Sequence, residues 1–209
     1  MTLHSAVRPI GDVVARVGRP EDMAQFLDPA CPAAIWHRQA VPAFQGWLDA
    51  LAPELLPNSR VVVHRSQVRP AVAEICELAK TPAGAARAHL IGDIVTLSET
   101  FAELMRTDYL RLRLDAVKTN ACRKFHVDAI TARLVCTYRG IGTQYGISAD
   151  GGDPERIFTV PTGAPILLRG TLAPEQPAAG LRHRSPPIEG SGTTRLVLVL
   201  DPVADPEDA

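Results

Sequence analysis

The hydrophobic pattern of this chain changes its period at Asp108. In the segment YLRLRLDAV (109–117), leucine alternates with arginine or aspartate, so its apolar side chains would share one face of a strand. In residues 68–106 the apolar residues instead recur at helical spacing, with a break at KTPAG (80–84). The pattern therefore predicts two helices, the second about twenty residues long, which cover one face of a sheet built by a β-rich C-terminal half.

Prolines and turns divide the rest of the chain into short elements. Before residue 68 we expect α/β scaffolding, with a strand at 12–17, a helical turn at 21–27, a strand at 33–37, a helix at 42–51 and a strand at 60–65. After the alternating segment, further β-like runs follow at 132–139, 156–160, 165–169 and 193–200. A small barrel or jelly roll is an economical way to close such a set of strands.

These elements predict one globular domain over 1–200. It would consist of an N-terminal α/β and helical part (1–107) and a β core (108–200). The segment 201–209, DPVADPEDA, is acidic and broken by prolines, so we expect it to be disordered.

The composition restricts the class of partner. The 209-residue chain has a formal net charge of -1, with 46% apolar and 22% charged residues, and so offers no electrostatic attraction for nucleic acid or an anionic membrane. The N-terminus lacks the apolar core of a secretory signal, no window is long enough for a membrane span, and the four cysteines form no CxxC pair. We expect a cytoplasmic protein with a small-molecule or protein substrate, and nothing indicates its oligomeric state.

The segment FHVD contains a candidate metal-binding pair. His126 and Asp128 are two positions apart, so in an extended segment both side chains project to the same side. His183, which precedes the turn SPP in the β-rich half, is a candidate third ligand. Two imidazoles and one carboxylate with open positions suit non-haem Fe(II), and zinc or manganese is also compatible. The alternative is that His and Asp are ordinary turn-forming or solvated residues at strand ends.

Arg195 lies inside the apolar run TTRLVLVL, where an arginine is costly to bury unless it meets an anion. A carboxylate-bearing co-substrate is a suitable partner. In TARLVCTYRG, Arg133 and Tyr138 fall on opposite faces of the expected strand. Tyr138 is a candidate hydrogen-bond donor to a bound carboxylate, and Arg133 a candidate to pair with an anion or to orient Asp128. The alternatives are half-buried packing for Tyr138 and a surface ion pair for Arg133.

The order of HxD, a distal histidine and then an arginine, on a β-rich half preceded by helices, resembles the Fe(II)/2-oxoglutarate-dependent oxygenases. That resemblance implies a double-stranded β-helix of the jelly-roll or cupin-like type, so the expected fold class is α+β. It also implies that His126, Asp128 and His183 are the Fe(II) ligands and that Arg195 binds the distal carboxylate of 2-oxoglutarate, with Tyr138 and Arg133 as further cofactor-binding candidates. The fuller segments FHVDAITARLVCTYRGIGTQ and HRSPPIEGSGTTRLVLVLD resemble an uncharacterised bacterial family, a domain of unknown function whose members often lie near zinc-homeostasis genes.

Three functional hypotheses follow. The first is an Fe(II)/2-oxoglutarate-dependent dioxygenase that hydroxylates or otherwise oxidises an unknown substrate. The second is a non-catalytic zinc-binding or zinc-homeostasis protein that uses the same three residues, with Cys122 or Cys136 as additional thiolate ligands. The third is a β module without metal, which would hold if His183 were more than about 6 Å from the other two side chains, because ligand bonds are much shorter.

Overall fold

The computed structural model describes residues 13–148, 150–175, 177 and 180–208. The expected first strand began at residue 12, which lies outside these residues. A seven-stranded sheet has the order β1-β2-β8-β5-β10-β4-β3, and a three-stranded sheet has the order β7-β6-β9. Within the described residues, no helix is long and apolar enough to cross a membrane.

The elements follow one another as β1 (Val14–Val17), η1 (Pro20–Leu27), β2 (Ala33–Trp36), α2 (Pro42–Ala50), η2 (Pro53–Leu55), β3 (Ser59–His64), η3 (Arg65–Gln67), α3 (Val68–Leu78), α4 (Ala85–Met105), β4 (Tyr109–Val117), β5 (Ala132–Arg139), β6 (Gln144–Ile147), β7 (Phe158–Thr159), β8 (Pro165–Arg169), β9 (Leu181–Arg184), β10 (Arg195–Val203) and η4 (Pro206–Asp208). Among these strands β1 and β2 pair in parallel and the others pair antiparallel. The fold is therefore α+β with a large, mainly antiparallel sheet.

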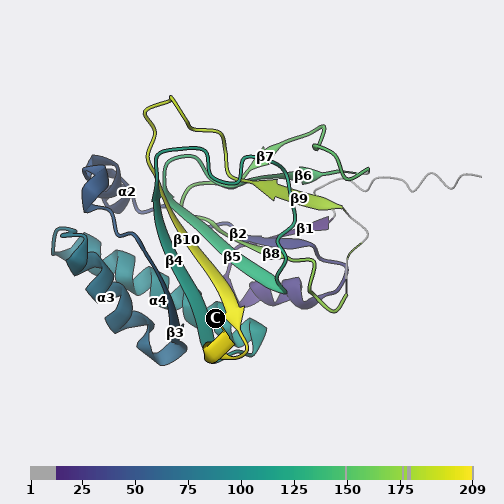
Figure 1. Ribbon diagram of the computed structural model, residues 1–209, viewed down its shortest axis with the longest axis horizontal. Helices are drawn as coiled ribbons and strands as arrows, with labels where there is room; N and C mark the ends of the chain where they lie inside the picture. The colour runs from purple at the N-terminus through teal and green to yellow at the C-terminus, as the bar shows by residue number, and fades with distance from the viewer. Residues whose placement is uncertain (1–12, 149, 176, 178–179, 209) are drawn as a thin grey trace, which may run out of the picture.

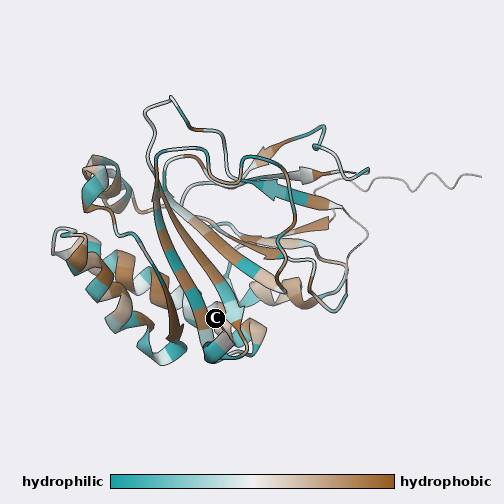
Figure 2. Ribbon diagram, in the orientation of Figure 1, coloured by the Kyte–Doolittle hydropathy of each residue, from teal (hydrophilic) through white to brown (hydrophobic). Residues whose placement is uncertain are grey.

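The helices cover one face of the large sheet (Figure 1). The predicted break between them is present, because Lys80 and Gly84 have φ values of 55° and 133° that no α-helix can contain. The leucines of β4 at 110, 112 and 114 are all fully buried in the same core as the helices, whereas its arginines lie on the opposite face. This alternation is visible as bands along β4 in Figure 2. Hydrophobic burial on one face thus sets the orientation of the strand.

A second, smaller core lies on the other face of the large sheet. It joins Val135, Val197 and Val199 of the central strands to Tyr145 of β6 and Leu181 of β9. The small sheet therefore packs opposite the end of the large sheet that carries β1, β2 and β8, as Figure 1 shows. The space between the two sheets is where the candidate site lies.

The structure corrects three expectations about the strands. The strand expected over 193–200 runs from Arg195 to Val203, so the segment predicted to be a disordered tail begins inside β10, where Asp201 is buried and ion-paired. The sequence predicts no strand around Gln144, yet this segment forms β6, because it pairs with both β7 and β9. The strand expected over 156–160 is reduced to Phe158–Thr159.

Candidate metal centre

His126 and His183 are brought together by backbone pairing. Each donates its backbone N–H to the carbonyl oxygen of the other, both at 3.0 Å, in an isolated antiparallel bridge between β9 and the segment before β5. Residues that face each other in this way direct their side chains to the same side. The two ring centroids are accordingly 4.5 Å apart.

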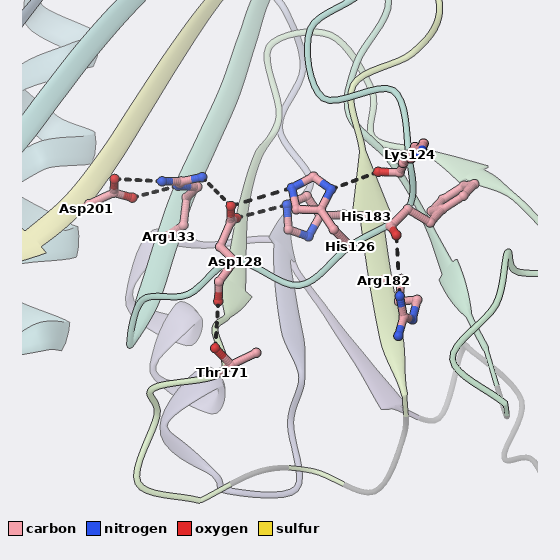
Figure 3. A network of polar contacts seen from close by, with 9 residues as sticks. Lys124, His126, Asp128, Arg133, Thr171, Arg182, His183 and Asp201 are labelled. Carbon is pink, nitrogen blue, oxygen red and sulfur yellow. Dashed lines mark hydrogen bonds and ion pairs between the residues drawn. The ribbon is translucent and has the colours of Figure 1, made fainter.

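Asp128 completes the cluster (Figure 3). Its Oδ1 lies 3.5 Å from His126 Nε2, and its Oδ2 lies 3.0 Å from His183 Nε2. One possible ligand atom from each of the three residues lies within 4.8 Å of the others. The wide separation of His183 on which the metal-free hypothesis depended is therefore not found.

Arg133 and the neighbouring loop hold Asp128 in place. Arg133 donates from one terminal nitrogen to Asp128 Oδ1 at 2.6 Å, and its Nε and other terminal nitrogen fork onto Asp201 at 2.6 and 2.7 Å. The backbone carbonyl of Asp128 accepts the N–H of Thr171 at 2.8 Å. The hypothesis that Arg133 orients Asp128 thus agrees with its position, and the orienting charge is itself anchored by a second carboxylate.

The protonation states of Asp128 and His183 suit metal binding. Burial alone would raise the pKa of Asp128, but the neighbouring imidazoles of His126 and His183 and the charge of Arg133 outweigh it and hold this pKa well below its usual range. Burial lowers the pKa of His183, so its imidazole is neutral near pH 7. The nearby Asp128 carboxylate raises the pKa of His126. An ionised carboxylate beside a neutral imidazole is the state that a metal ligand requires.

The hydrogen bonding of the three side chains also leaves ligand atoms free for a cation. Asp128 Oδ2 is buried and accepts no well-formed hydrogen bond from any described residue, although His183 Nε2 is close to it. His126 Nδ1 lies 2.8 Å from the carbonyl oxygen of Lys124, which favours a proton on Nδ1 and leaves Nε2 available as a ligand. Nitrogen and carboxylate donors of this kind suit Fe(II), manganese and zinc.

Arg195 lies in the cavity next to this cluster. A cavity of about 150 Å³ is lined by both histidines, Arg133 and Arg195. Arg195 is 2% exposed and donates to the carbonyl oxygen of Ile141 at 2.7 Å and to Thr137 Oγ1 at 3.2 Å. No acidic side chain among the described residues forms an ion pair with it. Desolvation lowers its pKa to about 10.

The family assignment comes from the sequence over most of its length. Residues 18–201 match the family model described as "Protein of unknown function (DUF1826)". The chain belongs to the DUF1826 family. No curated protein sequence matches it.

Solved structures similar to this DUF1826 chain include two plant dioxygenases. The complex of dioxygenase for auxin oxidation 1 from Arabidopsis thaliana with 2-oxoglutarate superimposes with a TM-score of 0.52 at 8% identity, over 92% of each chain. The rice dioxygenase for auxin oxidation gives a TM-score of 0.47 at 11% identity, over 93% of this chain and 84% of that one. At such identities the Arabidopsis similarity shows a shared fold and no more.

Two of the predicted residues in this DUF1826 chain lie elsewhere. Tyr138 and Cys136 point toward the helices, on the face of β5 opposite Arg133, because side chains alternate along a strand. Tyr138 donates to Asp93 Oδ2 at 2.6 Å and lines a different cavity of about 120 Å³, so its predicted role in binding the co-substrate is wrong.

The mixed thiolate site is also wrong as far as Cys136 is concerned. Its thiol is fully buried on the helix side, and desolvation raises its pKa to about 12, so it is a neutral core residue. Cys122 is exposed and lines the cavity near His126. Of the two cysteines that the zinc hypothesis named as alternatives, Cys122 therefore lies near the histidine and aspartate cluster and Cys136 does not.

Sequence reasoning missed Asp201 and Arg113. The sequence predicts that Asp201 belongs to the tail, yet it forms a buried ion pair with Arg133 of β5, a residue 68 positions earlier, which no local pattern signals. Arg113 was treated as the solvated face of an alternating strand, yet it lines the cavity. That face is covered by elements distant in sequence, so no local signal distinguishes the two cases.

Proposed function

We propose that this protein is an Fe(II)/2-oxoglutarate-dependent dioxygenase-like enzyme whose two sheets form a double-stranded β-helix. The observation that carries the proposal is the convergence of His126, Asp128 and His183, with a buried carboxylate oxygen that accepts no well-formed hydrogen bond from the described residues. The shared fold with a 2-oxoglutarate-bound dioxygenase from Arabidopsis thaliana supports it.

Each of the three residues would supply one ligand atom. His126 and His183 would bind through Nε2 and Asp128 through a carboxylate oxygen, a set that leaves positions for co-substrate and dioxygen. When bound, Fe(II) with 2-oxoglutarate would activate dioxygen to oxidise a substrate. Arg133 would keep the Asp128 carboxylate ionised and oriented, because it contributes a fixed positive charge at 2.6 Å.

Arg195 would bind the distal carboxylate of 2-oxoglutarate. A guanidinium with no acidic partner among the described residues, buried in the same cavity as the cluster, is complementary to an anion that enters from solvent. The Ile141 carbonyl and the Thr137 hydroxyl hold the guanidinium in position. Because the side chain is desolvated, its attraction for a carboxylate is stronger than at the surface.

The proposal is tested by anaerobic titration of Fe(II) and 2-oxoglutarate. We expect a weak visible charge-transfer band with wild-type protein and its loss in His126→Ala, while the exposed His37→Ala serves as the matched control and keeps it. In air, succinate should form from 2-oxoglutarate with wild-type protein and His37→Ala only. Absence of both the band and succinate, with unchanged metal content in His126→Ala, would refute the proposal. Stoichiometric zinc that is insensitive to Arg195→Ala would instead favour a non-catalytic zinc protein.

A further inference from the structure

The cavity has a second basic wall, which the proposed chemistry does not use. Arg113 and Asp115 of β4 line it together with both histidines. They project there because Leu112 and Leu114 occupy the helix-covered face of the same strand.

Two other arginines of the cavity, besides Arg195, already have partners. Arg133 is neutralised by two carboxylates, and Arg184 donates to Gln144 Oε1 at 2.8 Å and lies 4.4 Å from the centre of the Phe125 ring. The ion pair of Arg113 is less well formed. Its Nε lies 2.9 Å from a carboxylate oxygen of Asp115 but is buried without a well-formed hydrogen bond to any described residue.

Arg113 also faces a second arginine. In the β3–β4 ladder its partner is Arg60, so the two side chains emerge on the same side of the sheet. Like charges directly opposite each other destabilise an antiparallel pair. Arg60 is exposed and forms no ion pair with the described acidic residues. This pairing costs stability that a bound anion would recover.

The position of Arg113 differs from that of Arg195. In the β10–β4 ladder Arg113 is opposite Val199, whereas Arg195 is opposite Val117. Val199 and Arg195 are four positions apart on β10, a separation of about 13 Å along the strand. Val199 is also the partner of Val135, two positions from Arg133 on β5. Along the strands, Arg113 therefore lies at the end of the cavity that holds the metal cluster. Arg195, the residue assigned to the co-substrate, lies toward the other end.

We propose that Arg113 and Arg60 form an anion subsite, and that the substrate of this protein is an acid whose carboxylate or phosphate binds there. The assignment of that acid as the substrate rests on the proposed function, whereas anion binding does not. Asp115 neutralises Arg113 while the subsite is empty and must give way to the incoming anion. The carboxylate of Asp115 is thus a competitor of the ligand.

The test is a calorimetric titration of the full chain with inorganic phosphate, at constant ionic strength and without added metal. We expect Arg113→Gln to weaken phosphate binding about tenfold, the loss expected for one charge-assisted hydrogen bond. Asp115→Asn should tighten it by about threefold, because the competing carboxylate is removed. In an Arg195→Gln background, Arg113→Gln should weaken phosphate binding by the same factor, because the two positions are about 13 Å apart along the sheet. Arg69→Gln, an equal change of charge on the exposed side of α3, should have no effect.

The opposite responses of the two β4 variants keep the proposal refutable. The proposal is overturned if Arg113→Gln keeps the wild-type affinity for phosphate, and equally if Asp115→Asn does not bind phosphate more tightly. Either variant alone is sufficient for the test, so the proposal remains refutable if the other one folds poorly. Loss of phosphate binding in Arg195→Gln alone would assign the anion to the co-substrate position and also overturn it. Since no turnover is measured, a failure to form succinate would refute the oxygenase and leave the phosphate result standing.

Discussion

His126 and His183 face each other across an antiparallel bridge, with both backbone hydrogen bonds at 3.0 Å and the imidazole rings 4.5 Å apart. This pairing depends on the backbone and not on a metal ion, so the ligands are positioned before any ion binds. A site of this kind spends little binding energy on ordering its ligands.

Removal of metal should therefore leave the fold intact. We expect chelator-treated protein to keep its far-ultraviolet circular dichroism spectrum, while saturating Mn(II) raises its free energy of unfolding by mass action, about 2.7 kcal/mol at a hundredfold excess over Kd. In His183→Ala the metal-dependent increase should disappear. A chelator-induced loss of β structure would contradict this expectation.

Arg133 should be essential to stability. Replacement by methionine leaves the carboxylates of Asp128 and Asp201 buried without their cation, and we expect a loss of about 3–5 kcal/mol in the free energy of unfolding. Denaturant unfolding of Arg133→Met measures this loss. The double variant Arg133→Met with Asp201→Asn should recover part of this lost stability, because one of the two uncompensated charges is then absent. If no stability is recovered, the pairing of Arg133 with Asp201 does not contribute as proposed.

Arg195 should behave in the opposite way. It is also buried but has no acidic partner among the described residues, so Arg195→Met removes a desolvated charge, and we expect the stability of ligand-free protein to stay the same or rise by up to about 2 kcal/mol. Its pKa of about 10 is below the ordinary value, so the folded state releases this proton before the unfolded state.

The stability difference between Arg195→Met and wild type should depend on pH only at high pH. Below about pH 10 the folded and unfolded states both keep the Arg195 proton, so the difference should be constant. Above that pH the wild type should gain stability. Binding of 2-oxoglutarate, measured by calorimetry, should weaken at least about tenfold in the variant. A large destabilisation with unchanged 2-oxoglutarate affinity would make Arg195 a structural residue.

Gly170 should affect the metal site without touching a ligand side chain. A Cβ at this position would lie 2.0 Å from the carbonyl oxygen of Ile130 and 2.8 Å from that of Asp128. We expect Gly170→Ala to displace the loop that carries Asp128, with a loss of about 1–3 kcal/mol in stability and weaker Mn(II) binding. Gly92→Ala in α4, where a Cβ meets nothing within 4 Å, is the control and should be neutral or stabilising. Equal behaviour of the two variants would disprove the steric argument.

Tyr138 should matter to the helix side of the sheet alone. Tyr138→Phe removes the donor to Asp93, which also receives the fork of Arg38, so we expect a loss of about 1–2 kcal/mol in thermal or denaturant unfolding. Affinities for Mn(II) and 2-oxoglutarate should not change. A selective loss of 2-oxoglutarate binding would restore the original prediction for this residue.

The segments with a strong local pattern were predicted well. The strands at 132–139 and 165–169 have the predicted bounds, and the two helices flank the predicted break. Such segments bury one face or a continuous apolar run, so their periodicity is set by local sequence. The strand Gln144–Ile147 was missed, because its stability comes from pairing with β7 and β9 and its glycine-rich sequence carries no period of its own.

By itself the sequence determined that this is an α+β chain with its longest helices before its β-rich half, and that His126 and Asp128 share one side of an extended segment. Only the tertiary structure decided which face of each strand meets the cavity. That choice joined His183 to the pair, turned Asp201 into the anchor of Arg133, and removed Tyr138 and Cys136 from the site. The physical reason is that the alternation of side chains between the two faces of a strand is set locally. Which element packs against each face depends on chain segments far away in sequence.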